Sequence, residues 1–128
     1  MNIEKQLRAI EKKTNEALEK VVKGSYNELF NRTILRSPVR DGYFKSNWLA
    51  GYSFAPDTFY STDRDSIGLM KMKLNEFDIN AQFYFTNSLP YAQRLEYGYS
   101  DQAPNGMVRL GKAEFPQIAQ EQINKYKF

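Results

Sequence analysis

Apolar side chains recur every three or four positions over residues 1–34, with charged side chains between them. This spacing lines the apolar residues along one side of an α-helix, and Gly24 and Ser25 form a weak point at which the helix could bend. A helix of that length would extend over about 48 Å, which exceeds the width of a 15.0 kDa domain. Part of it is therefore expected to project, with its N-terminal half packed either on the chain's own sheet or on a neighbouring subunit.

The chain is expected to form one domain, in which residues 43–128 make up the body. Pro38 ends the first helix because a proline holds the residue before it, Ser37, outside the α region, and the turn continues through Gly42. The hydrophobic pattern then predicts two strands and two helices. The strands cover Asn47–Phe54 and 78–88, the second with Ile79, Ala81, Phe83 and Phe85 on one face. The middle helix has Ile67, Met70, Leu74 and Phe77 on one face and Ser61, Thr62 or Asp63 as its N-cap, and the C-terminal helix has a break or bend between Gly111 and Pro116.

The composition removes several kinds of chemistry from consideration. The chain has no cysteine and no histidine, which excludes thiol nucleophiles, histidine-dependent dyads and zinc sites built on those side chains. The formal net charge of +3 comes from well-mixed charges rather than from a basic face, so nucleic-acid binding is not indicated. No membrane span or secretory signal is expected, and the lack of cysteine suits a reducing cytoplasm. The nine tyrosines favour surfaces that become buried against a partner.

Residues 89–107 hold the densest mixture of aromatic, charged and turn-forming side chains in the chain. Glu96 and Asp101 could form an acid pair for general acid–base chemistry. The interpretation that we favour is that Glu96 binds Arg94, Arg109 or a backbone amide. The segment has no glycine-rich phosphate motif. We therefore expect no enzymatic activity and no cofactor.

Other patterns also have a ligand-binding and a structural interpretation. Asp63 and Asp65 could belong to a cation loop, but further oxygen ligands are missing from the sequence, so helix capping is preferred and no metal is expected. Phe83 and Phe85 could stack on single-stranded nucleic acid, although two aromatic residues on one strand face more commonly belong to a core. Gly106 follows an asparagine in a turn signal, where a positive φ is expected.

Two separated segments resemble the signatures of one protein family. The first, SPVRDGYFKSNW at 37–48, is similar to a signature that begins T/S-P-V-D-T-G and ends in tryptophan. The second, FTNSLPYAQRLEYGYSDQAPNGMVR at 85–109, is similar to a longer signature that contains N-x-x-P-Y-A, E-Y/F-G and Q-A-P-x-G-M-V-R. Both signatures belong to the tail-completion, or neck, proteins of long-tailed bacteriophages. Arg40, Asp41 and Tyr43 depart from the first signature, and Pro116 interrupts a helix that is normally unbroken in the family.

This resemblance implies an α+β fold with a long N-terminal helix, a small, mainly antiparallel sheet, a short middle helix and a C-terminal helix. It also implies a structural virion protein that forms a homo-oligomeric ring at the head–tail junction or at the top of the tail tube. Its partners would be other neck, connector and tail-tube proteins, with transient contact to passing DNA and none with membranes. Its location would be the virion, assembled in the host cytoplasm. Two alternatives stay open: a tail terminator ring protein, and a nucleic-acid-contacting module in the DNA exit channel.

Carried over position by position, the resemblance assigns structural roles to Pro38, Gly42, Trp48, Asn87, Pro90, Tyr91, Glu96, Gly98, Pro104 and Gly106. Asn87 is expected to bond its own backbone at the end of a strand. Pro90 is expected to begin a short helix, and Gly98 to end it in the left-handed region. Within that helix, Tyr91 and Leu95 would face the core.

A ring needs contact surfaces, and the sequence suggests two of them: the first helix and segment 89–107. Arg94 and Tyr97 would lie on the side of the short helix that faces away from the core, towards a partner. In a ring, one surface of each subunit meets a different surface of the next subunit. The candidate interface residues are Leu7, Ile10, Arg94, Tyr97, Tyr99 and Gln102.

Overall fold

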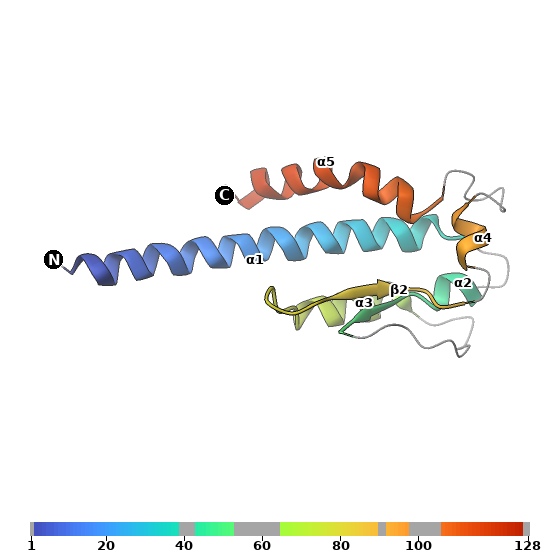
Figure 1. Ribbon diagram of the computed structural model, residues 1–128, viewed down its shortest axis with the longest axis horizontal. Coiled ribbons are helices and arrows are strands. Elements are labelled where there is room, and N and C mark those ends of the chain that lie inside the picture. Colours follow the sequence, from blue (N-terminus) through green and yellow to red (C-terminus); the bar gives the residue numbers. More distant parts are fainter. Residues whose placement is uncertain (1, 39–42, 53–64, 90–91, 98–105, 127–128) are drawn as a thin grey trace.

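The computed structural model describes residues 2–38, 43–52, 65–89, 92–97 and 106–126. The longest element is helix α1, Ile3–Arg36 (Figure 1). It continues through Gly24 without interruption and ends where Ser37 adopts an extended conformation (φ −66°, ψ 137°), as expected for a residue before proline. The helix predicted over residues 1–34 is therefore confirmed, and it continues to Arg36.

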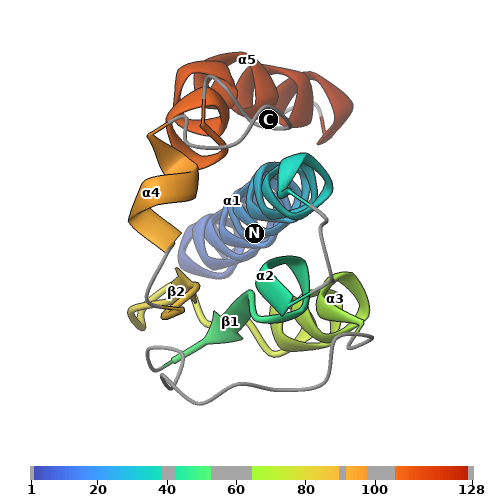
Figure 2. The ribbon, with the colours of Figure 1, turned by 90° about the vertical axis from the view of Figure 1, so that its right-hand side faces the viewer.

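The remaining described elements are α2 (Tyr43–Ser46), β1 (Leu49–Gly51), α3 (Ser66–Asn75), β2 (Tyr84–Thr86), α4 (Ala92–Glu96) and α5 (Val108–Tyr126). The two strands pair antiparallel, with Ala50 opposite Phe85. Figure 2 shows α1 in the middle, α5 on one side of it, and the sheet with α2 and α3 on the other side. The chain thus has the expected α+β fold. None of the helices within the described ranges is both long and apolar enough to cross a membrane.

The core lies between α1 and the layer formed by the sheet and α3, and aromatic rings pack against one another within it. The ring of Phe85 lies against those of Phe30 and Trp48, with centroid distances of 4.2 Å and 4.7 Å. Phe83 packs against Phe77 in an edge-on contact at 5.6 Å. Such ring pairs add to the stabilisation that burial of their area provides. The core interpretation of Phe83 and Phe85 is therefore confirmed, although both side chains remain partly exposed.

The strand predicted over 78–88 is wrong in its first half, because β2 begins only at Tyr84. The side chain of Asp78 accepts a hydrogen bond from the backbone N–H of Asn80 at 2.9 Å. A local bond of this kind forms a turn and competes with pairing in a sheet. Ile79 and Ala81 are exposed as a result, and neither belongs to the core.

The strand predicted over Asn47–Phe54 is also shorter than expected. The backbone N–H of Asn47 bonds the carbonyl of Phe44 at 3.1 Å and so closes α2, which the hydrophobic pattern did not predict. Strand pairing therefore begins only at Leu49, and it extends to Gly51. Phe54 lies outside the described residues.

The predicted N-cap of the middle helix is wrong, although the helix itself is confirmed. Its cap is Asp65, whose side chain accepts a hydrogen bond from the backbone N–H of Gly68 at 2.9 Å. This residue directly precedes the first helical residue, which is the position from which a side chain can reach the unpaired N–H groups. The three candidates, Ser61, Thr62 and Asp63, lie outside the described residues.

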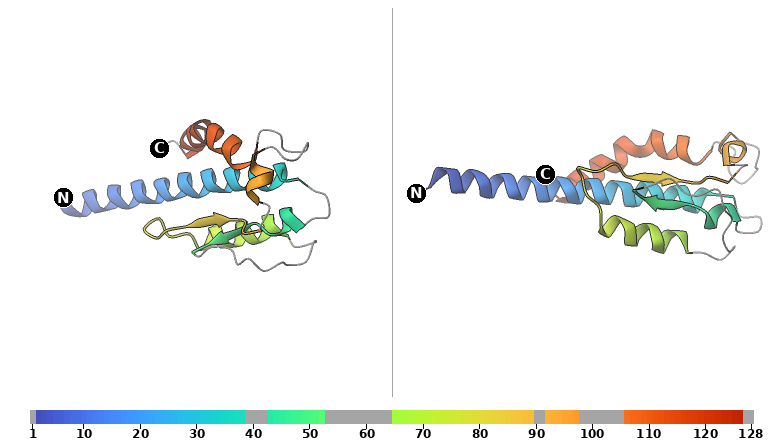
Figure 3. Two further views of the ribbon diagram at one scale, coloured as in Figure 1. Left: turned by 45° about the vertical axis from the view of Figure 1, so that its right-hand side comes forward. Right: turned by 60° about the horizontal axis from the view of Figure 1, so that its bottom comes forward.

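Of the break or bend expected between Gly111 and Pro116, the break does not occur: α5 is a single helix, and its axis curves along its length (Figures 2 and 3). Pro116 lies on the exposed side, where water can hydrate the carbonyl that the proline leaves without an N–H partner. Gly111 is buried, and a Cβ atom there would lie 2.7 Å from Cδ1 of Leu29 on α1. The glycine therefore serves the close approach of the two helices.

Candidate functional site

The two signature segments meet at one end of α1. The indole Nε1 of Trp48 donates a hydrogen bond to Oγ of Ser37 at 2.7 Å, and that hydroxyl donates in turn to the carbonyl of Thr33 at 2.9 Å. Asn87 Nδ2 donates to the carbonyl of Phe44 at 2.8 Å, which links the second segment to the first. Residues that are about 40 positions apart in the sequence are thus joined by side-chain hydrogen bonds. These contacts give Trp48 and Asn87 a structural role in the fold.

Several residues of the two signature segments have the contacts or the burial that their predicted structural roles require. Asn87 Oδ1 accepts a hydrogen bond from the backbone N–H of Leu89 at 3.2 Å, so the local bond expected of Asn87 is present. Pro38, Trp48 and Gly106 are buried. The remaining motif and candidate interface positions, Gly42, Pro90, Tyr91, Gly98, Tyr99, Gln102 and Pro104, lie outside the described residues, as does Asp101.

Glu96 caps the N-terminus of α5 from the end of α4. Its Oε1 atom accepts hydrogen bonds from the backbone N–H groups of Met107 at 3.0 Å and Val108 at 2.7 Å. Its Oε2 atom accepts from the backbone N–H of Arg109 and from Arg109 Nε, both at 3.1 Å. These backbone groups lie at a helix start, where no intrahelical partner is available, and the helix dipole there favours a negative charge. The structural interpretation of Glu96 is therefore confirmed.

This capping geometry also sets the acidity of Glu96. Burial raises the pKa of the carboxyl group, but hydrogen bonds from the three backbone N–H groups and from Arg109 outweigh burial and lower the pKa below its usual value. A general acid at neutral pH requires the opposite shift. Glu96 is thus held ionised as a structural anion.

Gly106 completes this corner of the molecule. Its φ of +82° lies in the left-handed region, as the turn signal predicts. A Cβ atom at this position would lie 2.6 Å from the carbonyl oxygen of Glu96 and would also collide with the Glu96 carboxylate. Glycine is required here both for its conformation and for its lack of a side chain. The capping of α5 by Glu96 therefore depends on the identity of residue 106.

Arg94 and Tyr97 lie on the exposed side of this corner, whereas Leu95 packs against the core. The Tyr97 side chain is 64% exposed, and the Arg109 guanidinium lies 4.7 Å from the centroid of its ring. A large, exposed aromatic side chain with a neighbouring cation has the composition of a protein contact surface. Figure 2 shows α4 at the edge of the molecule, between β2 and α5.

The N-terminal half of α1 extends beyond every other described element (Figures 1 and 3). All residues over 2–16 are exposed, and the first buried side chain of the helix is Val21. Ile3, Leu7 and Ile10 are 67%, 61% and 61% exposed. Their spacing of four and three residues places them on one side of the helix. We refer to these three residues as the projecting stripe.

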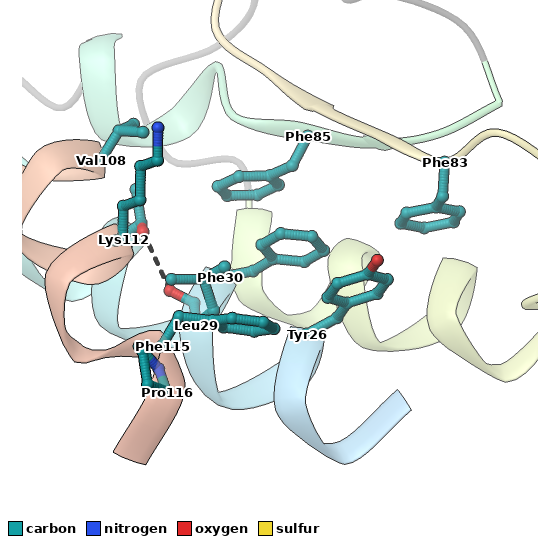
Figure 4. Close-up of a pocket in the computed structure, with 10 residues that line it drawn as sticks. Tyr26, Leu29, Phe30, Phe83, Phe85, Val108, Lys112, Phe115 and Pro116 are labelled. Carbon is teal, nitrogen blue, oxygen red and sulfur yellow. Dashed lines mark hydrogen bonds between the residues drawn. The ribbon is translucent and has the colours of Figure 1, made fainter. Parts of the chain in front are cut away.

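A groove opens between α1, α5 and β2, with a volume of about 480 Å³. Its aromatic floor is made by Phe30, Phe83 and Phe85, and α5 contributes Val108 and Lys112 along one side (Figure 4). A second cavity of about 330 Å³ lies next to it under α4 and shares Phe85 and Val108 with it. Sequence reasoning missed the groove because its walls come from three elements that are distant in the chain.

The described residues contain no cluster of three or more acidic side chains that could hold a metal ion. Asp65 caps α3, as the structural interpretation of its segment predicts, and Asp63 lies outside the described residues. The arrangement therefore offers contact surfaces and a groove rather than a set of convergent reactive groups, within the part of the chain that is described. Comparisons of the chain with protein-family models, with curated proteins and with solved structures gave no match.

Proposed function

We propose that this chain is a structural subunit of a bacteriophage neck, which assembles as a ring at the head–tail junction or at the top of the tail tube. The observation that carries the proposal is the projecting stripe. Burial of a leucine or isoleucine side chain stabilises a structure by roughly 1.5–3 kcal/mol. In the isolated chain the three side chains of the stripe, which are neighbours on the helix surface, are exposed and do not provide this stabilisation. A helix that holds a row of such side chains away from the body is suited to contact with another subunit.

The signature segments support the same proposal through the roles of their residues. Glu96, Asn87 and Trp48 each fix one part of the backbone to another, and Glu96 is fully engaged in hydrogen bonds to α5. These hydrogen bonds fix the positions of the exposed side chains that α4 presents, which is what a contact surface between subunits requires. Tyr97 and Arg94 lie on such an exposed surface.

The proposal is tested in the phage that encodes the chain. Particles that lack the protein are expected to accumulate as separate heads and tails, and cryo-electron microscopy of intact virions is expected to place the protein at the neck. The double variant Leu7→Asp/Ile10→Asp should fail to restore joining, while Ala9→Asp, an exposed substitution on another side of α1, should restore it. Density for the protein at the tail tip or within the capsid shell would contradict the proposal.

A further inference from the structure

We propose that the projecting stripe of one subunit binds in the aromatic groove of the next subunit. This inference rests on the proposed function and names the two surfaces that make the ring contact. The stripe is a helix face with apolar side chains at positions i, i+4 and i+7, and the groove is a mainly apolar channel between two helices and a strand. Insertion of an amphipathic helix into such a groove is a common mode of protein recognition.

The stripe cannot reach the groove of its own chain. Ile3, Leu7 and Ile10 lie at one end of α1, while Tyr26, Phe30 and other residues of the same helix form part of the groove. Because α1 is a single helix without interruption, Ile10 and Tyr26 are held about 24 Å apart. A stripe that enters this groove must therefore belong to another molecule.

The acids along one border of the stripe are complementary to Lys112 in the groove, which favours a second copy as the occupant. Glu4 precedes Leu7 by three positions and Glu11 follows it by four, so both acids border the stripe along one side. Lys112 is exposed and lines the α5 side of the groove next to Val108 (Figure 4). The pair between Glu4 and Arg8 is exposed, with an N–O distance of 2.7 Å, and exposed pairs of this kind exchange partners at little cost. An acid of the incoming helix can therefore face Lys112.

The contact joins two different surfaces, because each subunit donates a stripe and accepts one. Such a head-to-tail contact produces a closed ring when its rotation closes, and an open filament when it does not. A contact between two stripes would instead join the same surface twice and stop at a dimer. The number of chains in a covalently trapped assembly therefore distinguishes the two arrangements.

Cross-linking of engineered cysteines tests the contact directly, because the chain has no cysteine of its own. A chain that carries Leu7→Cys and Val108→Cys, treated with a short bismaleimide, is expected to give a ladder of dimers, trimers and larger species on denaturing gels. Ala9→Cys with Val108→Cys is the matched control and should give little product. Dimers formed by a chain that carries only Leu7→Cys, or the lack of a ladder at every protein concentration tested, would overturn the proposal.

A mixing experiment tests whether the two surfaces belong together without any cross-linker. Leu7→Asp/Ile10→Asp removes the stripe and keeps the groove, and Val108→Arg/Lys112→Glu blocks the groove and keeps the stripe. Each variant alone should self-associate at least about tenfold more weakly than the unmodified chain. The two variants mixed should form a one-to-one dimer, measured by sedimentation velocity, and should not grow further. Failure of the mixed chains to pair, while each remains folded by circular dichroism, would refute the contact.

The charge complementarity has its own test. Lys112→Glu is expected to weaken self-association by roughly twofold to fivefold, and Glu11→Lys in the same chain is expected to restore it. A loss that Glu11→Lys deepens would contradict the complementarity between the acidic border of the stripe and Lys112. The contact and the proposed function can be refuted independently. If the protein is found at the neck but gives no cross-linked ladder, the contact is refuted and the neck assignment stands. If the protein gives a ladder but is found elsewhere in the particle, the neck assignment is refuted and the contact stands.

Discussion

Glu96 is the single residue whose change gives the clearest expected effect on stability. Glu96→Gln replaces one of two accepting oxygens by an amide group, which cannot accept hydrogen bonds from the start of α5. We expect the free energy of unfolding at neutral pH to fall by about 1–2 kcal/mol, the usual magnitude for loss of a charged helix cap. Urea denaturation measures the difference. Glu16→Gln, at an exposed position of α1, is the control and should leave the midpoint unchanged.

The same residue predicts a dependence on pH. Because the folded-state pKa of Glu96 lies below the usual 4.5, the unfolded chain binds this proton more readily than the folded chain. The contribution of the cap is therefore fully present above about pH 4.5 and is lost as the pH falls through the folded-state pKa. Denaturation curves of the unmodified chain and of Glu96→Gln should converge in acid. A difference that stays constant down to pH 3 would show that the carboxylate charge is not responsible.

Gly106→Ala is expected to disrupt the same corner by a steric route. The backbone conformation costs an L-residue roughly 1–2 kcal/mol, and the added Cβ atom would also displace the Glu96 carboxylate from α5. We therefore expect a loss of more than about 2 kcal/mol in the free energy of unfolding. Gly51→Ala is the matched control, since no atom lies within 4 Å of a Cβ atom there. Equal effects of the two substitutions would contradict the close approach at Gly106.

At the scale of elements, one carboxylate between two arginines links α1 and α5 in addition to the packing of the two helices. Glu114 accepts hydrogen bonds from Arg36, with Nη2 to Oε2 at 2.8 Å, and from Arg32 at 3.3 Å. Hydrogen bonds from Arg36 lower the pKa of Glu114, as expected for an ionised acceptor. Glu114→Gln should lower the free energy of unfolding by about 0.5–1 kcal/mol, because the group is partly solvated.

Salt distinguishes this ionic contact from simple packing of the two helices. The difference between Glu114→Gln and the unmodified chain should shrink at about 1 M NaCl, where charges are screened within roughly 3 Å. Glu121→Gln, an exposed acid on the same helix, should show no difference at either salt concentration. A Glu114→Gln effect that is independent of salt would assign the loss to packing.

The short helix α4 should matter for assembly and not for stability. Arg94→Ala with Tyr97→Ala removes two exposed side chains, including the ring below the Arg109 guanidinium. Loss of an exposed cation–π contact is expected to lower the thermal midpoint by no more than about 4 °C. Joining of heads to tails, scored by plaque formation, should decline if α4 faces a partner. A larger fall in the midpoint would instead place these side chains within the fold.

Elements with strong periodicity could be predicted from the sequence, whereas their edges could not. The long helix is specified by a pattern sustained over its whole length, and α3 by apolar residues that include Met70 and Leu74. The alternation of apolar and polar residues around Ile79 is as regular as that of a strand. It does not reveal that the side chain of Asp78 accepts a hydrogen bond from the backbone N–H of Asn80, which forms a turn there. The capping role of Glu96 could be expected in kind, since a backbone amide was among its predicted partners. The helix that Glu96 caps, α5, could be identified only from the tertiary structure.

At the scale of the whole molecule, the projecting half of α1 should be dispensable for folding. A chain without residues 2–14 keeps every buried side chain of the described structure, since Val21 is the first of them. Its thermal midpoint should lie within about 4 °C of that of the full chain, and assembly into particles should be lost. A strongly destabilised truncated chain would show that these residues contact the body.

The backbone of this half should also be the more dynamic part of α1. A helical segment of about 15 residues without tertiary contacts is marginal in water. In the unassembled chain, amide hydrogens over residues 5–16 are therefore expected to exchange much faster than those over 25–34, as measured by hydrogen–deuterium exchange. Assembly should slow the first set and leave the second set unchanged. Equal protection of both sets in the unassembled chain would contradict the exposed placement of the stripe.

If the stripe and the groove make the ring contact, the length of α1 sets the stagger between adjacent subunits, because this helix carries the stripe and also forms one wall of the groove. Seven residues inserted between Thr14 and Val21 would lengthen the helix by about 10.5 Å and return the stripe to nearly the same side. Five inserted residues would turn the stripe by about 140° and face it away from the neighbouring groove. A change in the length of this single helix by whole turns would thus change the spacing of adjacent subunits and leave the body of the protein unaltered.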